Sequence, residues 1–212
     1  MLGAGLVLLK IAAQNASVDR AIAVSLHLVN AFLLLASLTL TAWWATTCSS
    51  RFRLRAAGSV RLAFLVVAVG TAIIGASGAV VALGDTLFPA GSLAEGLCQD
   101  VDPTVSFLIR LRAVHPATAV VGGLGLAALA SRVSQRTDSP EVKHAAGRLT
   151  PIVFVQRLTG ITEVFLLAPV LLQLVHLLLA DLVWIAQKLL AATRLGISEE
   201  MARAVEPALV GP

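Results

Sequence analysis

The chain has 212 residues, of which 58% are hydrophobic and only 13% are charged, and its mean hydropathy is +0.89. Soluble domains carry roughly 25% charged residues, so this composition excludes a soluble globular domain and predicts an all-α membrane protein of about five transmembrane helices. The net charge of +4 does not indicate a nucleic-acid partner, because no basic run is interleaved with aromatic residues. In a membrane protein, excess Lys and Arg is typical of cytoplasmic loops.

Apolar blocks follow one another along the chain, and a helix needs about 20 such residues to cross the roughly 30 Å hydrocarbon core. Residues 1–12 are apolar but too short to span, as at the end of a helix. The first predicted span ends at Trp43 and Trp44, which suit the membrane interface, and Pro169 opens the last span, since proline is tolerated in a first helical turn. The predicted spans are residues 21–45, 62–83, 106–130, 149–167 and 169–191.

The charges of the connections predict how the spans are oriented. The loop after the first span is basic, the connection 84–103 carries four acidic residues and no base, and the loop 131–148 is basic again. Basic loops stay in the cytoplasm, so spans one, three and five run inward, in the inner (plasma) membrane. The basic loops carry Arg51, Arg53, Arg55, Arg61, Arg132, Arg136, Lys143 and Arg148. The two cysteines, Cys48 and Cys98, lie in different connections and match no metal or disulfide framework.

Three of the four histidines lie inside predicted spans, and His144 lies in a basic loop. Ionisable side chains in membrane helices are rare and usually functional, although each could be a packed histidine bonded to a carbonyl. His27, His115 and His176 follow the starts of spans one, three and five. At 1.5 Å per residue all three lie roughly 9–14 Å below the outer surface, on helices that run in one direction.

The last four spans predict an antiparallel four-helix bundle, in which spans three and five are diagonal. Imidazoles of His115 and His176 that project inward at equal depth can then ligate the iron of one heme from both faces. A structural zinc site is less favoured, because no further thiolate or carboxylate accompanies the pair at that depth.

The small residues and the basic residues near these histidines each have two possible roles. Gly70, Gly75 and Gly78 permit close helix packing or a macrocycle lying against the backbone. Arg110 and Arg112 stand near the outer end of span three. They could pair with heme propionates or extend their charges to the interface.

Two further charged residues, Arg157 and Glu163, fall inside span four. Their six-residue spacing is not that of an i, i+4 pair. Each is therefore expected to face a polar partner inside the bundle, and the sequence assigns neither of them a role.

Four strings, SLHLVNAFLLLASLTLTAWW, GASGAVVALGDTLFP, RLRAVHP and LLAPVLLQLVHLLLADLVWI, resemble the heme A synthase family over roughly residues 1–192. The resemblance implies two four-helix halves. The C-terminal half would bind a heme b cofactor through residues matching His115 and His176. The N-terminal half would bind heme O, whose methyl group is oxidised to the formyl group of heme A, and His27 matches a histidine of that half.

On this resemblance, residues 1–58 are a remnant of the substrate half, 59–192 the heme b bundle and 193–212 a cytoplasmic tail. The first two to three family helices are absent, so a fragment and a shortened homologue are both open. Implied partners are heme O, membrane lipid, an unnamed electron donor and heme O synthase, with a homo-oligomer left open. No catalytic residue is named. The competing functions are a heme b electron-transfer cytochrome without heme O turnover and a structural or transport bundle without heme.

Overall fold

The computed structural model describes residues 17–47, 53–54 and 58–197. These residues form an all-α membrane protein, as predicted, with one short pair of antiparallel strands. The elements are α2 (Val18–Thr46), β1 (Arg53–Leu54), α3 (Gly58–Leu87), α4 (Leu93–Val101), α5 (Phe107–Gln135), α6 (Pro140–Phe165), α7 (Val170–Leu195) and β2 (Gly196–Ile197). Some of the expectations concern residues outside the described ranges, namely residues 1–12, Cys48, Arg51, Arg55 and the tail beyond residue 197.

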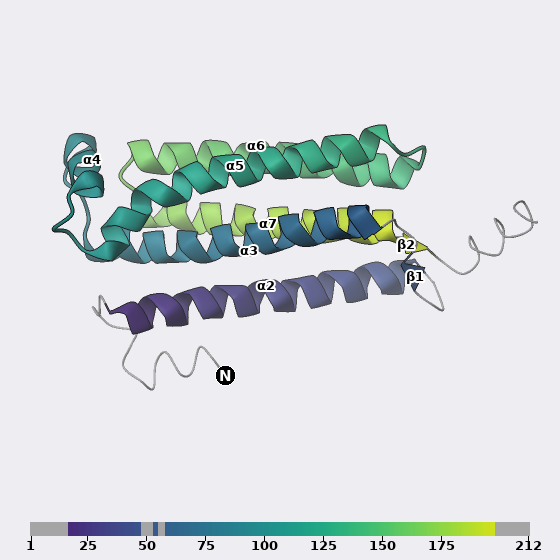
Figure 1. Cartoon of the computed structure of the whole chain (residues 1–212), viewed down its shortest axis with the longest axis horizontal. Coiled ribbons are helices and arrows are strands. Elements are labelled where there is room, and N and C mark those ends of the chain that lie inside the picture. Colours follow the sequence, from purple (N-terminus) through teal and green to yellow (C-terminus); the bar gives the residue numbers. More distant parts are fainter. Residues whose placement is uncertain (1–16, 48–52, 55–57, 198–212) are drawn as a thin grey trace, which may run out of the picture.

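Within the described part of the chain, four helices are long and apolar enough to cross a membrane: α2, α3, α5 and α7. They correspond to the first, second, third and fifth predicted spans. Residues 149–165 of the fourth predicted span lie in α6, and its last two residues follow the end of that helix. The 26 residues of α6 extend about 39 Å but include more polar side chains. Helix α6 runs beside α5 and α7 along their length (Figure 1), so it lies in the same layer as they do.

Two helices begin where the sequence predicted loops. Helix α6 starts at Pro140, inside the predicted loop 131–148, because Ser139 caps it by accepting a hydrogen bond from the Val142 amide at 3.4 Å. Helix α4 lies inside the predicted connection 84–103, and Ser92 caps it by accepting from the Glu95 amide at 3.2 Å. Both predicted loops were therefore too long. Capped helices form within them, although these segments contain few apolar residues.

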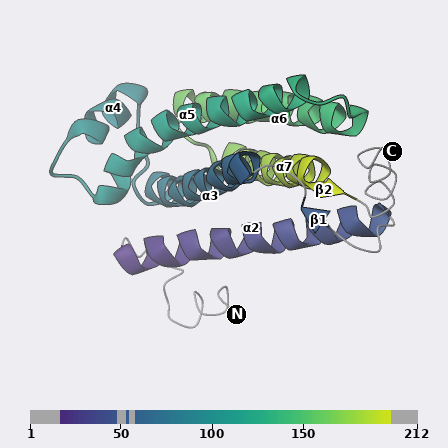
Figure 2. The ribbon, with the colours of Figure 1, turned by 45° about the vertical axis from the view of Figure 1, so that its right-hand side comes forward.

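The helices form an antiparallel bundle (Figures 1 and 2): α2, α5 and α7 run one way, and α3 and α6 run the other. Helix α5 packs against α3 and α6, while α7 packs against α6 and, less extensively, α3. Helices α5 and α7 therefore occupy opposite corners of a four-helix bundle, as predicted. Helix α2 packs outside it, against α3 and α7. Helix α4 covers one end of the bundle, here called the α4 end, and β1 and β2 lie at the other, the strand end.

Two separate apolar clusters make up the core. The larger joins α3, α5, α6 and α7 toward the strand end and includes Leu149 and Leu190, neither of which is exposed. The smaller lies near the α4 end around Leu108. Polar side chains of α5, α6 and α7 fill the level between the clusters, and large apolar side chains cover the outside of the helices, as contact with lipid requires.

Candidate functional site

The structure brings His115 of α5 and His176 of α7 together between the two apolar clusters. Eight and six residues past their helix starts, they lie about 12 and 9 Å below the α4 end. The two rings are half-buried and close enough to interact electrostatically. His27 has a similar depth on α2, but it is exposed there, on a helix that packs outside the bundle. Two of the three in-span histidines therefore converge.

The hydrogen bonds of His115 favour one tautomer. Its Nδ1 lies 2.9 Å from Ser77 Oγ, and that hydroxyl is placed to donate to the Ile74 carbonyl at 2.8 Å. A ring with its hydrogen on Nδ1 fits this arrangement, because Ser77 Oγ then accepts from Nδ1–H. The ring lies against Gly78, where an added Cβ would be 2.9 Å from His115 Cε1. This tautomer leaves the Nε2 lone pair available to a metal.

His176 adopts the same tautomer by a different route. The Gln156 amide nitrogen lies 3.0 Å from His176 Nε2, and because an amide NH₂ only donates, Nε2 must accept. The hydrogen is therefore on Nδ1, which lies 3.8 Å from Glu163 Oε2, slightly beyond hydrogen-bond length. The ring rests on Gly160, where an added Cβ would be 2.9 Å from His176 Cε1.

Helix α6 supplies the polar wall of this site. Gln156, Gly160 and Glu163 share one face at i, i+4 and i+7. Arg157 lies beside them against α5 and interacts electrostatically with both histidines. Among the described residues, Gln156 Oε1, Arg157 Nε and Glu163 Oε1 are buried without a hydrogen-bond partner. Buried polar atoms are normally satisfied, so these atoms indicate a site that binds a further group. The five side chains are here called the histidine cluster: His115, Gln156, Arg157, Glu163 and His176.

Arg112 has a structural role that neither sequence reading described. Its guanidinium donates to Asp100 at 2.7 Å through Nε and to Asp85 at 3.2 Å through Nη1. It also donates through Nη2 to the Gly96 carbonyl at 3.0 Å and to Gln99 at 3.1 Å. Arg112 thus ties α4 to α3 and α5. Arg110 is exposed, and contact of either arginine with propionates stays a prediction.

The three glycines of α3 lie in different environments. Gly78 borders His115, as described. At Gly75 an added Cβ would lie 2.7 Å from the ring of Phe32, so its small size lets α2 pack closely, as the packing alternative expected. At Gly70 nothing lies within 4 Å. Phe32 also stacks on Trp184 of α7, with ring centroids 4.8 Å apart, and its carbonyl accepts from the indole N–H at 2.7 Å.

The turn between α6 and α7 sets the position of Glu163 relative to His176. Leu167 and Ala168 adopt left-handed backbone angles, with φ of 58° and 51°, and the Ala168 amide donates to the Glu163 carbonyl at 2.8 Å. The side chain of Gln173 donates to the Ala168 carbonyl at 2.6 Å. The AP-x-x-x-Q string, residues 168–173, therefore encodes a braced turn.

Sequence reasoning missed Ser77, Gln156 and Gly160 as neighbours of the histidines. The signal for Gln156 was readable, because an uncharged amide in a membrane span needs a partner inside the bundle. Ser77 and Gly160 carried no such signal, since small residues are common in membrane helices. Their roles depend on which helix faces them.

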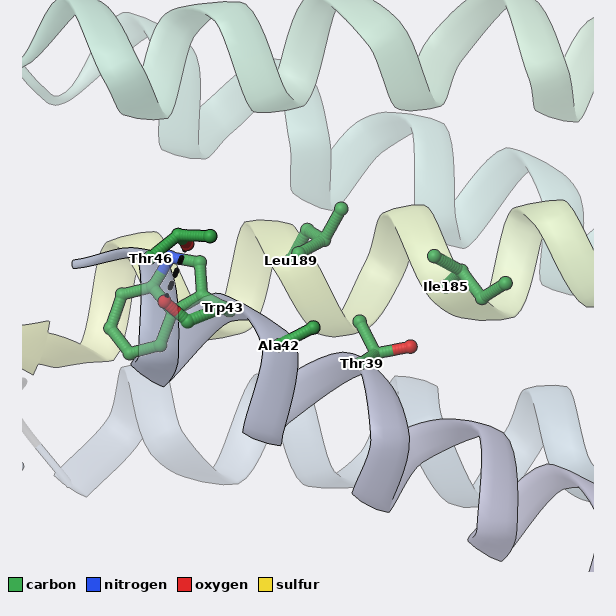
Figure 3. Close-up of a pocket in the computed structure, with 6 residues that line it drawn as sticks. All are labelled: Thr39, Ala42, Trp43, Thr46, Ile185 and Leu189. Carbon is green, nitrogen blue, oxygen red and sulfur yellow. Dashed lines mark hydrogen bonds between the residues drawn. The ribbon is translucent and has the colours of Figure 1, made fainter.

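A surface pocket of about 370 Å³ lies elsewhere, between α2 and α7 (Figure 3). Its lining is largely apolar and contains no ionisable side chain, and its α7 residues lie about 14 Å or more along the helix from His176. It therefore does not coincide with the histidine cluster. The pocket is lined by Thr39, Ala42, Trp43, Thr46, Ile185 and Leu189.

Comparison with known proteins gives one family match. The COX15-CtaA model, described as cytochrome oxidase assembly protein, matches residues 1–187. Two curated proteins named "Protoheme IX farnesyltransferase", from two strains of Thermus thermophilus, are each 42% identical over 195 residues. That match covers 92% of this chain and 32% of each relative, so the chain spans about a third of the length of these relatives. No solved structure matches the chain.

Proposed function

This chain belongs to the COX15-CtaA family of cytochrome oxidase assembly proteins, and from that premise we propose that it is a membrane oxidoreductase of heme A biosynthesis. In this proposal it converts the methyl group of heme O to the formyl group of heme A, with heme b as cofactor. One observation carries the proposal: His115 and His176, from opposite corners of a membrane bundle, lie at similar depth and close enough to interact electrostatically, with Nε2 of His176 occupied only by the Gln156 side chain.

The described residues fit a heme better than a bare metal ion. A histidine that ligates heme does so through one ring nitrogen while the other donates a hydrogen bond. Here Nδ1 of His115 lies against Ser77 Oγ, and Nδ1 of His176 faces Glu163. The described residues contain no group of three or more His, Cys, Asp or Glu placed to hold an ion. Two imidazoles suffice when the metal arrives in a macrocycle.

Heme b, when bound, would supply one-electron redox chemistry. The residues of the chain would hold and shield it. Imidazoles of His115 and His176 would hold the heme iron, with Gln156 giving up its contact to His176 Nε2. The apolar clusters on either side exclude water, and Arg157 places a positive charge beside both rings. Arg110, which is exposed, is a more available partner for a carboxylate than Arg112, which binds two carboxylates already.

The orientation follows from the charges at the two ends of the bundle. Arg132 and Arg136 lie at the strand end, whereas Asp85, Asp100 and Asp102 lie at the α4 end. By the positive-inside rule, we place the strand end in the cytoplasm and the α4 end outside the inner membrane. The histidine pair would then lie toward the extracytoplasmic side.

The name of the relatives supports a role in heme modification without supplying the reaction. "Protoheme IX farnesyltransferase" describes proteins about three times as long as the matched segment, so farnesyl transfer is not assigned to this chain. We propose heme O synthase as a partner in the same pathway, heme O as substrate near His27, and a further copy of the chain as a neighbour in lipid. The electron donor is left open.

A second candidate function is a heme b electron-transfer cytochrome. It is favoured by one observation: His27 is exposed on α2, apart from the histidine pair. A single heme site could shuttle electrons without acting on heme O.

Purified protein, expressed with adequate heme supply, distinguishes these candidates. We expect a low-spin heme b spectrum that is lost or altered in His115→Ala and in His176→Ala. The spectrum should be unchanged in the control His144→Ala, which lies exposed on α6. Hydroxylated or formylated heme after incubation with heme O, reductant and oxygen would support the oxidoreductase, and none would support the cytochrome. Colourless protein would contradict both.

A further inference from the structure

Glu163 of α6 has no role in the functions considered so far. We propose that Glu163 is a positioning residue for His176. Its carboxylate would accept the hydrogen bond from His176 Nδ1–H and so hold the Nε2 atom of that ring toward the iron of bound heme b. The inference rests on the proposed function, because it takes His176 to be one of the residues that would hold the heme.

The two groups already face one another. His176 Nδ1 lies 3.8 Å from Glu163 Oε2, and an approach of about 1 Å would form a hydrogen bond of normal length. His176 Nδ1 and Glu163 Oε1 are both buried without any hydrogen-bond partner among the described residues. The 3.8 Å distance is to Oε2, the other oxygen of the same carboxylate. An unpartnered donor therefore lies near a carboxylate that has an unpartnered oxygen, and the two groups are complementary.

Heme binding would replace the contact that Gln156 now makes with His176 Nε2. Neutral imidazole has one lone pair, at Nε2, and in the structure that lone pair accepts from Gln156 at 3.0 Å. Iron and Gln156 cannot both use it. Once iron takes Nε2, the ring keeps Nδ1–H as its polar link to the protein, and Glu163 is the carboxylate that faces it.

The fold holds the carboxylate in place for this task. The Glu163 carbonyl accepts from the Ala168 amide at 2.8 Å in the braced turn, which leads directly into α7 and His176. The two ligands also differ: His115 Nδ1–H has a neutral partner, the Ser77 hydroxyl, whereas His176 Nδ1–H faces a carboxylate. A carboxylate partner makes a ligating histidine more basic, so His176 would be the stronger electron donor to iron.

Two variants separate a hydrogen bond from simple charge removal. Glu163→Gln removes the charge but keeps an acceptor, and Glu163→Leu removes both. The control is Asp181→Asn, which removes a half-buried carboxylate from α7. The measurement is the midpoint potential of heme b bound to the full chain, together with the electron paramagnetic resonance spectrum of the ferric state.

Weaker donation from His176 destabilises ferric heme, so both Glu163 variants should have more positive potentials. We expect the ferric/ferrous equilibrium of Glu163→Leu to shift at least tenfold toward ferrous, which is about 59 mV for a one-electron couple. The equilibrium of Glu163→Gln should shift less, and its electron paramagnetic resonance spectrum should stay closer to that of the unaltered protein. Asp181→Asn should change the equilibrium by less than about twofold.

The outcomes distinguish failure of this inference from failure of the proposed function. If the unaltered chain binds heme b through two histidines and both Glu163 variants keep its potential and spectrum, the inference is overturned and the function stands. Equal shifts in Gln and Leu would also overturn it, because charge alone would explain them. If the unaltered chain binds no heme b, the proposed function fails and the inference with it. Should Glu163→Leu not fold, an unshifted Glu163→Gln is by itself sufficient for refutation.

Discussion

Replacing Gly160 with alanine should weaken heme binding while leaving the fold intact. The added Cβ would lie 2.9 Å from His176 Cε1, whereas carbon atoms pack best at about 3.5–4.0 Å. The ring must therefore move by about 0.6 Å or more, and ligand geometry tolerates only about 0.5 Å. We expect about tenfold weaker binding of heme b, equivalent to about 1.4 kcal/mol.

The free energy of unfolding of the variant should change little, because two effects oppose each other. Alanine in a helix interior is favoured over glycine by about 1 kcal/mol. Displacing the His176 ring costs energy, but only a small amount, because the displaced atom is at the end of a movable side chain. A matched control is available on the same helix: Gly147→Ala, where nothing lies within 4 Å of the added Cβ. This control gains the same helix propensity, and its heme affinity should not change.

The assay pairs a heme b titration, followed by the Soret band, with thermal unfolding of the same detergent-solubilised samples. If Gly160→Ala bound heme as tightly as Gly147→Ala, the ring of His176 would not rest on Gly160 in the heme-bound state. The reasoning that couples helix α6 to the ligand would then be wrong. A large loss of stability in Gly160→Ala would instead contradict the view that the His176 ring can be displaced at little energetic cost.

Three further changes test other parts of the site. Arg112→Met leaves two carboxylates without their cation and should destabilise the α4 end by about 3 kcal/mol; limited proteolysis of α4 measures this, and Arg110→Met is the control. Trp184→Phe removes the indole N–H that binds the α2 backbone and should lower the free energy of unfolding by about 1 kcal/mol, measured by denaturant titration. Arg157→Gln removes a positive charge beside both rings and should make the heme potential more negative, by about 1 kcal/mol in the redox equilibrium. An unchanged potential would contradict that placement.

The spans and the depth of the histidines were predictable because both depend on local properties. Crossing a membrane requires a run of apolar residues, and the run is visible in the sequence. Equal depth on parallel helices follows from counting residues at about 1.5 Å each. Diagonal placement of α5 and α7 followed from short connections, which favour antiparallel neighbours. His115 and His176 therefore lie at the similar depth that simple geometry expected, and their joint ligation of a heme stays a prediction.

The contacts around these histidines were not predictable, because they depend on which helices face one another. Gly75 and Gly78 look alike in the sequence and lie within one turn, yet one borders Phe32 and the other borders His115. Arg112 binds Asp85 of α3, which is distant in the sequence, and Asp100 of α4, a helix that the sequence did not predict. The start of α6 was readable from Ser139 and Pro140, a normal capping pattern, but the surrounding charges favoured a loop.

The modest apolarity of α6 and the position of the histidine cluster have one physical cause. Soluble helices turn their polar face to water, but α6 turns Gln156 and Glu163 toward the rings of α5 and α7. From residue 151 to residue 165 its exposed side chains are apolar, as contact with lipid requires; they include Phe154 at 68% and Phe165 at 65%. A hydropathy average over α6 mixes these two faces and so underestimates how well the helix suits lipid. In the second half of α6 the most polar residues, Gln156, Arg157 and Glu163, are the ones that line the site, and for this reason a polar stretch in a membrane helix of such a bundle indicates where a ligand binds.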